Sequence, residues 1–158
     1  MQDNNKTKEL IAYLIGEHPN ASVTALMKLC YLIDLVFVKE GKPQLTNFEY
    51  IRYRFGPFDK KIYQFMEQLT SEGLVAQKQE YTTSGKDFII YELNEENRNS
   101  HPNLSEEETS IIKKVISNVV GHGAKGLTQI AYKTKPMIAI GAEMDNDSGL
   151  FHKLNLNT

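Results

Sequence analysis

The stretch that decides the fold is SVTALMKLCYLIDLVFV, residues 22–38. Its apolar residues recur at the i, i+3, i+4, i+7 spacing of one helix face, from Leu26 to Phe37. Further apolar residues widen this stripe almost all the way round, which is typical of a helix packed on several sides. Ser22 or Thr24 is suited to cap the start of the helix. We therefore predict a central, buried helix over this stretch.

One charged residue, Asp34, interrupts the apolar run between Leu29 and Val38. Burying an unpaired carboxylate is costly, so we expect Asp34 to have a partner. The candidates are Arg52 and Arg54, which we expect to alternate outward on a following strand, with Lys28 and Tyr31 on nearby turns of the helix. We interpret Asp34 first as part of a buried ion pair or hydrogen-bond network that fixes helix against strand, and second as a partner-binding residue.

The sequence on either side predicts further elements. The helical spacing of apolar residues predicts a helix over 6–17, and aromatic and β-branched residues predict a strand over 48–55 that Gly56-Pro57 ends. A helix capped by Asp59 and closed at Gly73 follows. Two strand-like runs, 74–81 and 87–93, then form a β-hairpin. Strand, helix and hairpin is the order of a winged-helix unit.

The C-terminal third begins after a polar connection at 96–103. Ser105 to Glu108 matches the capping box of a helix, and a shorter helix containing Leu127 ends before Pro136. From Met137 onward the sequence has no clear period. We predict an α+β fold, mainly α, with a small antiparallel sheet and a β-hairpin. We expect one domain over 1–158, with 1–95 and 104–158 on either side of the polar connection.

Composition and charge place the chain among ordinary globular proteins. Of its 158 residues 41% are hydrophobic and 24% are charged, which excludes collagen-like, disulfide-scaffold and wholly disordered classes. With 18 Lys and Arg against 20 Asp and Glu, the net charge of −2 gives no general attraction to nucleic acid. A polar N-terminus, one cysteine and no apolar run of membrane-spanning length lead us to expect a cytoplasmic protein without a membrane partner.

No arrangement of reactive residues indicates an enzyme. The run from Gly121 to Gly126 matches G-x-G-x-x-G, but it follows a helix rather than a strand, so we interpret it as a helix–helix connection. The four histidines have no zinc spacing, and Cys30 lies within the apolar stripe of the central helix. We expect no catalytic residue, no metal and no cofactor.

Several motifs together resemble a known family. They are Lys28-x-x-Tyr31-x-x-Asp34, then Gly41-Lys42-Pro43, then Tyr50 to Gly56-Pro57, and a helix ending in Gly73-Leu74-Val75. In this order and spacing they resemble the Panacea domain of SocA-like antitoxins, and weaker similarity continues through Leu127 to Pro136. Where the last motif of the family tends to have His and then Trp, this chain has Tyr132 and Met137.

The resemblance implies a bacterial, phage or mobile-element protein that neutralises a cognate protein toxin by binding it, and members can also present a toxin to a protease. It assigns motif or partner-binding roles to Lys28, Tyr31, Asp34, Gly56 and Pro57, beside Arg52 and Arg54. Exposed aromatic residues would carry most of the binding energy. The candidates for that role are Tyr31, Tyr50, Tyr53 and Phe58. The alternatives are a winged-helix regulator that binds DNA, and a phage or mobile-element protein with another role.

Overall fold

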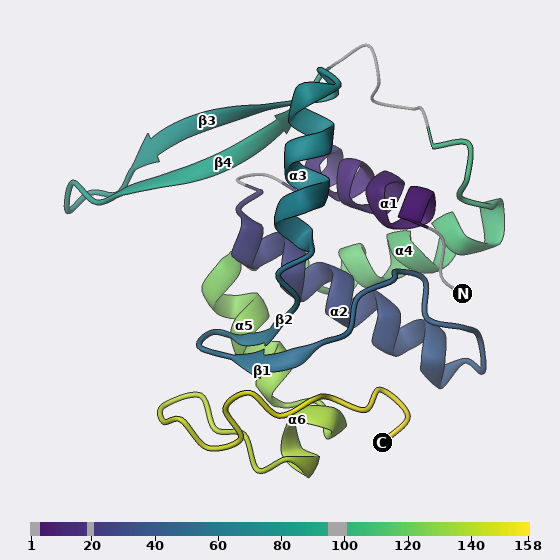
Figure 1. The fold of residues 1–158 in the computed structure, drawn as a ribbon, viewed down its shortest axis with the longest axis vertical. Helices are drawn as coiled ribbons and strands as arrows, with labels where there is room; N and C mark the ends of the chain where they lie inside the picture. The colour runs from purple at the N-terminus through teal and green to yellow at the C-terminus, as the bar shows by residue number, and fades with distance from the viewer. Residues whose placement is uncertain (1–3, 19–20, 95–100) are drawn as a thin grey trace.

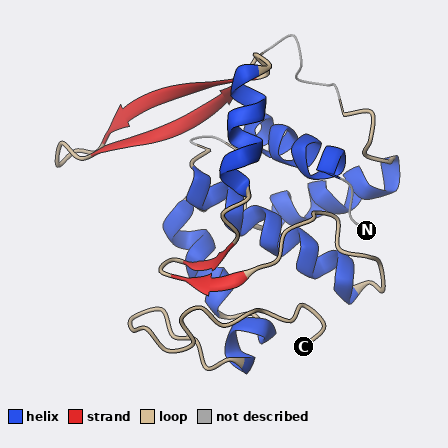
Figure 2. Cartoon of the chain, in the orientation of Figure 1, coloured by secondary structure: helices blue, strands red, loops and turns tan. Residues whose placement is uncertain are grey.

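The structure is a computed structural model that describes residues 4–18, 21–94 and 101–158. Within these ranges it has six helices and two antiparallel two-stranded sheets, which confirms the mainly helical α+β prediction (Figures 1 and 2). The helices are α1 (Asn4–Glu17), α2 (Val23–Lys39), α3 (Ile62–Ser71), α4 (Glu106–Asn118), α5 (Ala124–Tyr132) and α6 (Lys135–Ala139). The strands are β1 (Ile51–Tyr53), β2 (Gly56–Phe58), β3 (Val75–Tyr81) and β4 (Asp87–Leu93). None of the described helices is long and apolar enough to cross a membrane.

Helix α2 lies at the centre of the fold, as predicted. Ser22 caps its start, where its side chain accepts a hydrogen bond from the backbone amide of Ala25. The helix contacts α1, α4, α5 and β2, so its neighbours surround it on several sides (Figure 1). This environment explains why so few positions along α2 are polar.

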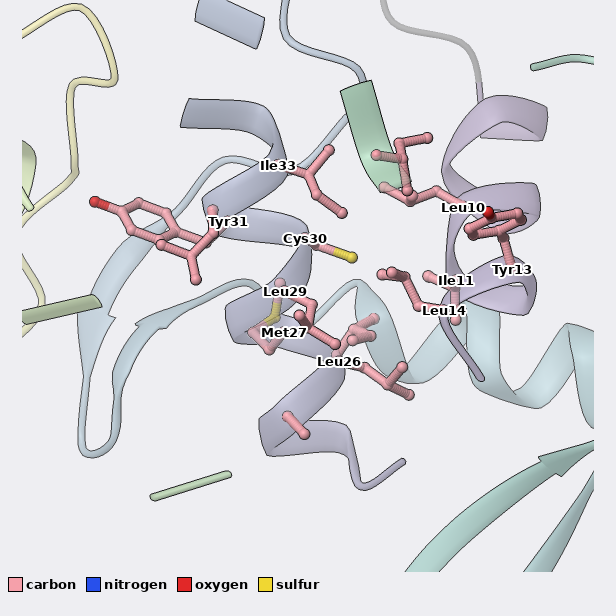
Figure 3. Packing of buried hydrophobic residues seen from close by; sticks show 14 of the residues in the cluster. Leu10, Ile11, Tyr13, Leu14, Leu26, Met27, Leu29, Cys30, Tyr31 and Ile33 are labelled. Atoms are coloured by element: carbon pink, nitrogen blue, oxygen red, sulfur yellow. The ribbon is translucent and has the colours of Figure 1, made fainter. Parts of the chain in front are cut away.

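The main apolar cluster forms where α2 faces α1. Leu26, Cys30 and Ile33 are fully buried and point toward α1, whereas Tyr31 points to the opposite side of the helix (Figure 3). Burial also raises the pKa of the Cys30 thiol well above its ordinary value, which keeps the thiol in its unreactive form. The apolar residues of α2 therefore build the core on one side and leave the other side for polar groups.

The strand in the predicted region 48–55 is shorter than expected, since β1 covers only Ile51–Tyr53. Gly56-Pro57 does not end the strand region, because β2 begins at Gly56 and pairs antiparallel with β1. Gly56 has φ +103°, a conformation that glycine adopts without strain, so it allows a tight return of the chain after Tyr53. A backbone bridge between Ile51 and Lys153 adds the C-terminal segment along the other edge of β1.

The predicted β-hairpin is confirmed as β3 and β4, which project from the body of the molecule (Figure 1). The strand before α3 does not join this hairpin, because β1 pairs with β2 in a sheet of its own. The likeness to a winged-helix unit therefore rests on element order alone and stays a prediction. The helix after Asp59 begins at Ile62, and Asp59 accepts a hydrogen bond from the Lys61 amide in the turn before it.

The C-terminal elements follow the predicted boundaries with one exception. Residues 121–123 connect α4 to α5, as expected for a helix–helix connection. The helix containing Leu127 ends before Pro136, as predicted, but Pro136 then stands in the first turn of a further short helix, α6, where a missing amide hydrogen costs nothing. Residues 96–100 of the predicted polar connection lie outside the described residues.

The capping box at the start of α4 gives a first test of the fold. The Ser105 hydroxyl accepts from the Glu108 amide at 3.0 Å, and the Glu108 carboxylate accepts from the Ser105 amide at 2.8 Å. Ser105→Ala removes one arm of this pair, and we expect it to lower the free energy of unfolding by about 1 kcal/mol in urea denaturation. Ser110→Ala, in the next turn of the same helix, is the control. Equal stability of the two variants would contradict the capping role.

Candidate partner-binding site

Three residues of α2 share the polar side of the helix at intervals of three. Lys28, Tyr31 and Asp34 are at most 2% exposed, and each bonds to a different neighbouring segment. Lys28 reaches β2, Tyr31 reaches the junction of α5 and α6, and Asp34 reaches the loop that leads into β1. The predicted motif therefore forms one buried cluster that joins α2 to three other parts of the chain.

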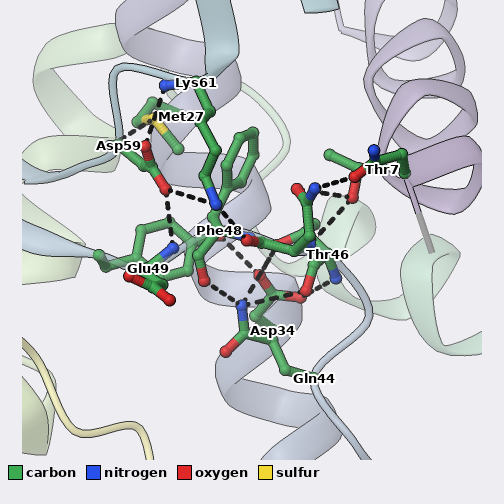
Figure 4. A network of polar contacts seen from close by, with 12 residues as sticks. Thr7, Met27, Asp34, Gln44, Thr46, Phe48, Glu49, Asp59 and Lys61 are labelled. Carbon is green, nitrogen blue, oxygen red and sulfur yellow. Dashed lines mark hydrogen bonds and ion pairs between the residues drawn. The ribbon is translucent and has the colours of Figure 1, made fainter. Parts of the chain in front are cut away.

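Asp34 is fully buried and accepts four hydrogen bonds. Its Oδ1 accepts from the backbone amides of Leu45 and Thr46, both at 3.0 Å. Its Oδ2 accepts from the Thr46 hydroxyl at 2.6 Å (Figure 4) and from the Tyr50 hydroxyl at 2.6 Å. The predicted hydrogen-bond network is thus confirmed, and it fixes the loop at residues 45–50 to the centre of the fold.

Of the two predicted arrangements for Asp34, the structure has the hydrogen-bond network, and no ion pair joins Asp34 to an arginine among the described residues. All four donors to Asp34 come from the loop at residues 45–50, which supplies enough hydrogen bonds without a cation. Burial raises the pKa of Asp34 from 3.8 to about 6, and the hydrogen bonds from Thr46, Tyr50 and Leu45 oppose that rise without cancelling it. A neutral or a charged carboxyl is accommodated here because both neighbouring hydroxyls can accept as well as donate.

The same loop, residues 45–50, has further polar contacts that the sequence did not indicate. The Thr7 hydroxyl of α1 accepts from the Asn47 amide at 2.9 Å, and Asp59 accepts from the Glu49 amide at 2.8 Å (Figure 4). No sequence signal indicated that Thr46 would be buried, because threonine is mostly an exposed residue. Hydrogen bonds therefore attach the loop to α1, to α2 and to the turn before α3.

Lys28 is buried beside β2 without a carboxylate among the described residues. Its Nζ donates to the Pro57 carbonyl at 3.0 Å. A Cβ on Gly56 would lie 3.4 Å from both the Lys28 side chain and the Tyr132 ring, so the glycine allows these groups to approach the hairpin closely. Burial lowers the pKa of Lys28 from 10.5 to about 7, because the charged form loses its hydration.

Two of the four aromatic residues expected at a partner surface belong to the core. The Tyr31 hydroxyl lies 2.7 Å from the Thr134 hydroxyl, and its ring meets the Tyr50 ring edge to face at 5.3 Å. Both tyrosines are at most 3% exposed, so neither forms part of the surface of this fold. Tyr53 and Phe58 are half-buried and keep part of their rings at the surface.

Arg52 points inward rather than outward, contrary to the prediction. Its guanidinium donates to the carbonyls of Tyr53, Glu143 and Asn146 at 2.6 to 2.8 Å, and it lies 5.2 Å over the ring of Tyr132. Because β1 side chains alternate, the position before Tyr53 faces the protein interior. Arg52 therefore holds the C-terminal segment against β1.

Arg54 is the exception among the seven predicted site residues. It lies exposed in the turn between β1 and β2, where its guanidinium is 5.9 Å over the Tyr53 ring. Lys28, Tyr31, Asp34, Arg52, Gly56 and Pro57 are all buried beneath this turn. Six of the predicted residues are thus buried, three of them on α2 and three within the β1–β2 hairpin, and the seventh is at the surface.

The buried carboxyl of Asp34 gives a pH-dependent test. Its pKa is higher in the folded chain than in the unfolded chain, so the folded state holds more protons between pH 4 and 6 and stability falls as pH rises through that window. We expect a loss of about 2–3 kcal/mol in the free energy of unfolding, measured by urea denaturation at several pH values.

The matched variants separate charge from hydrogen bonding. Asp34→Asn keeps an acceptor for the Leu45 and Thr46 amides, so we expect a stable fold without the loss between pH 4 and 6. Asp34→Ala leaves four buried donors without an acceptor, and we expect a cost of about 3 kcal/mol or more. Asp145→Asn, an exposed control, keeps the wild-type profile. An Asp34→Asn profile like that of the wild type would contradict this account.

Lys28 gives the opposite pH dependence. Its pKa is lower in the folded chain, so the unfolded chain binds more protons between pH 7 and 10 and stability rises with pH across that range. We expect Lys28→Met to flatten this rise and to stabilise the fold at pH 7 by about 1–3 kcal/mol in urea denaturation. Lys39→Met, exposed at the end of the same helix, serves as the control. Destabilisation by Lys28→Met at pH 7 would show that the Pro57 bond outweighs desolvation.

Comparison with known proteins identifies the family of the chain. No curated protein and no solved structure matches the chain. The family model described as "Antitoxin SocA-like, Panacea domain" matches residues 26–136. This range begins in α2 just before Lys28 and contains every residue of the buried cluster described above. The chain belongs to the SocA-like antitoxin family with a Panacea domain.

Proposed function

We propose that this protein is an antitoxin that binds a cognate protein toxin directly and blocks its action, in the cytoplasm and without catalysing a reaction. The observation that carries the proposal is the buried cluster of Lys28, Tyr31 and Asp34 within the region that matches the family. These residues hold the β1–β2 hairpin and its loop in one geometry before any partner arrives. A preformed surface loses little conformational entropy on binding, which favours tight association.

Electrostatics favour a protein partner over DNA. Lys78, the basic residue of β3, forms ion pairs with Glu80 at 3.2 Å and with Glu92 at 3.6 Å. A lysine neutralised in this way contributes little to phosphate binding, which depends on unpaired cations. Strand β3 of the projecting hairpin is therefore poorly suited to phosphate contacts. We propose that the whole chain acts as one unit, since its main apolar cluster extends from Leu10 to Leu156.

Co-expression tests the proposal. The product of the gene adjacent to the one encoding this chain is expressed in a bacterial host, with and without this protein, and growth is recorded. We expect growth arrest that this protein relieves, together with a complex that co-purifies. Absence of both relief and complex would overturn the proposal.

The fate of the toxin distinguishes two modes of neutralisation. Blocking by binding leaves the half-life of the toxin unchanged, whereas presentation to a protease, the second mode that the family resemblance implies, shortens it. The half-life is measured by immunoblot after translation is stopped. A catalytically inactive variant of the host protease is the control, because it restores the half-life only in the second mode.

A further inference from the structure

Four aromatic rings form a continuous row across the outer side of the β1–β2 hairpin. Tyr53 stacks on Phe58 with ring centres 5.2 Å apart, Phe151 lies 5.9 Å from Tyr53, and Tyr63 lies 6.0 Å from Phe58. They come from β1, β2, α3 and the C-terminal segment. We call Tyr53, Phe58, Tyr63 and Phe151 the aromatic strip.

The strand register explains why the central rings face outward. Ile51 pairs with Phe58 across the sheet, so Ile51, Tyr53 and Phe58 share one face, while Arg52 and Pro57 share the buried face. Tyr63 is 55% exposed and Phe151 is 63% exposed. Large apolar groups gathered at one place on the surface mark an interaction site more often than scattered ones do.

Phe151 has a backbone conformation that its side chain does not favour. It is the one described non-glycine residue with positive φ, at +68°. Its amide donates to the Arg52 carbonyl at 2.7 Å, and the Arg52 amide donates to the His152 carbonyl at 2.8 Å, so the backbone is fixed against β1. A phenylalanine here is strained and yet mostly exposed, so neither backbone geometry nor core burial accounts for it.

Unpaired cations lie beside the aromatic strip. Arg54 follows Tyr53 directly, Lys60 lies between Phe58 and Tyr63 in sequence, and Lys153 is bridged to Ile51. All three are exposed, and none forms an ion pair with another described residue. Aromatic residues and arginine are the side chains most enriched in binding hot spots.

We propose that the aromatic strip and Arg54 are the surface on which the partner protein docks, through a segment that carries apolar side chains next to a carboxylate. The inference rests on the function proposed above and names the contact surface for it. The rings provide apolar area, and the unpaired cations select acidic groups at the edge of the contact. The buried cluster beneath the hairpin keeps the rings in place.

A single-stranded nucleic acid is the less suitable occupant. Bases bind by stacking on open ring faces, but Tyr53 already stacks on Phe58 and lies under the Arg54 guanidinium. Three cations also offer few contacts to a phosphate backbone. Nucleic acid binding is therefore an outcome that the experiment below is designed to detect.

The experiment measures binding of the adjacent-gene product to purified variants by isothermal titration calorimetry. Phe151→Gly removes a ring and relieves the positive φ, so we expect an unchanged or higher melting temperature with binding weaker by at least about 30-fold. Tyr63→Ser tests the strip from α3, and Arg54→Glu is expected to weaken binding more than Arg54→Ala. Tyr81→Ser and Val120→Ser, exposed residues away from the strip, are the matched controls and keep wild-type affinity.

Each other outcome has a distinct meaning. If the wild type binds but the Phe151, Tyr63 and Arg54 variants bind equally well, the surface is wrong and the proposed function stands. If the wild type itself neither binds nor restores growth, the proposed function fails and the assigned occupant fails with it. If fluorescent dT15 or U15 binds and Phe151→Gly abolishes that binding, the strip is a nucleic-acid platform and the proposal is overturned.

Discussion

The Asp34 carboxylate accepts hydrogen bonds from two backbone amides and two hydroxyls of a single loop. It does so from within α2, the most apolar of the described helices. These four hydrogen bonds determine the path of residues 45–50 and therefore where β1 begins. Because β2 pairs with β1 and the C-terminal segment follows the other edge of β1, the positions of both strands and of that segment depend on this contact. An apolar residue at 34 would pack well but would leave the loop without a fixed attachment.

The buried polar side chains of α2 fix the position of neighbouring segments, and their burial has a cost in stability. Asp34 and Lys28 are both buried, and burial shifts the pKa of each toward the neutral form. A helix selected for stability alone would carry an apolar residue at position 28, whereas an apolar residue at position 34 would leave four buried donors without an acceptor. The bonds of these groups to the loop and to Pro57 instead determine how the β1–β2 hairpin lies on the core, which a non-directional apolar contact cannot do as sharply.

Much of this fold could be predicted from the sequence, because the signals were local. The buried helix from residue 22, the capping box at Ser105 and the hairpin of β3 and β4 follow from spacing and capping chemistry within a few residues. The turn at Arg54 and Phe55 was missed because Gly56-Pro57 usually ends a strand, whereas here glycine's positive φ lets a second strand start. The short helix α6 was missed because five residues show no period.

The candidate site was predictable in its members but not in their contacts. Lys28, Tyr31 and Asp34 are recognisable by their spacing on one helix. The partner of Asp34 is a loop separated from it by about ten residues, and spacing does not tell which of several nearby polar groups will reach a buried acid. The row formed by Tyr53, Phe58, Tyr63 and Phe151 joins residues almost one hundred positions apart, so only the folded chain brings it together.

Several of the contacts that support the hairpin end on backbone atoms. Lys28 bonds to the Pro57 carbonyl, Arg52 bonds to the carbonyls of Glu143 and Asn146, and Asp34 bonds to two amides. A backbone carbonyl or amide stays the same when the side chain at that position changes. The exposed side chains along the hairpin turn and the C-terminal segment can therefore be exchanged without changing the supporting contacts, so a redesign of this surface need not alter the fold beneath it.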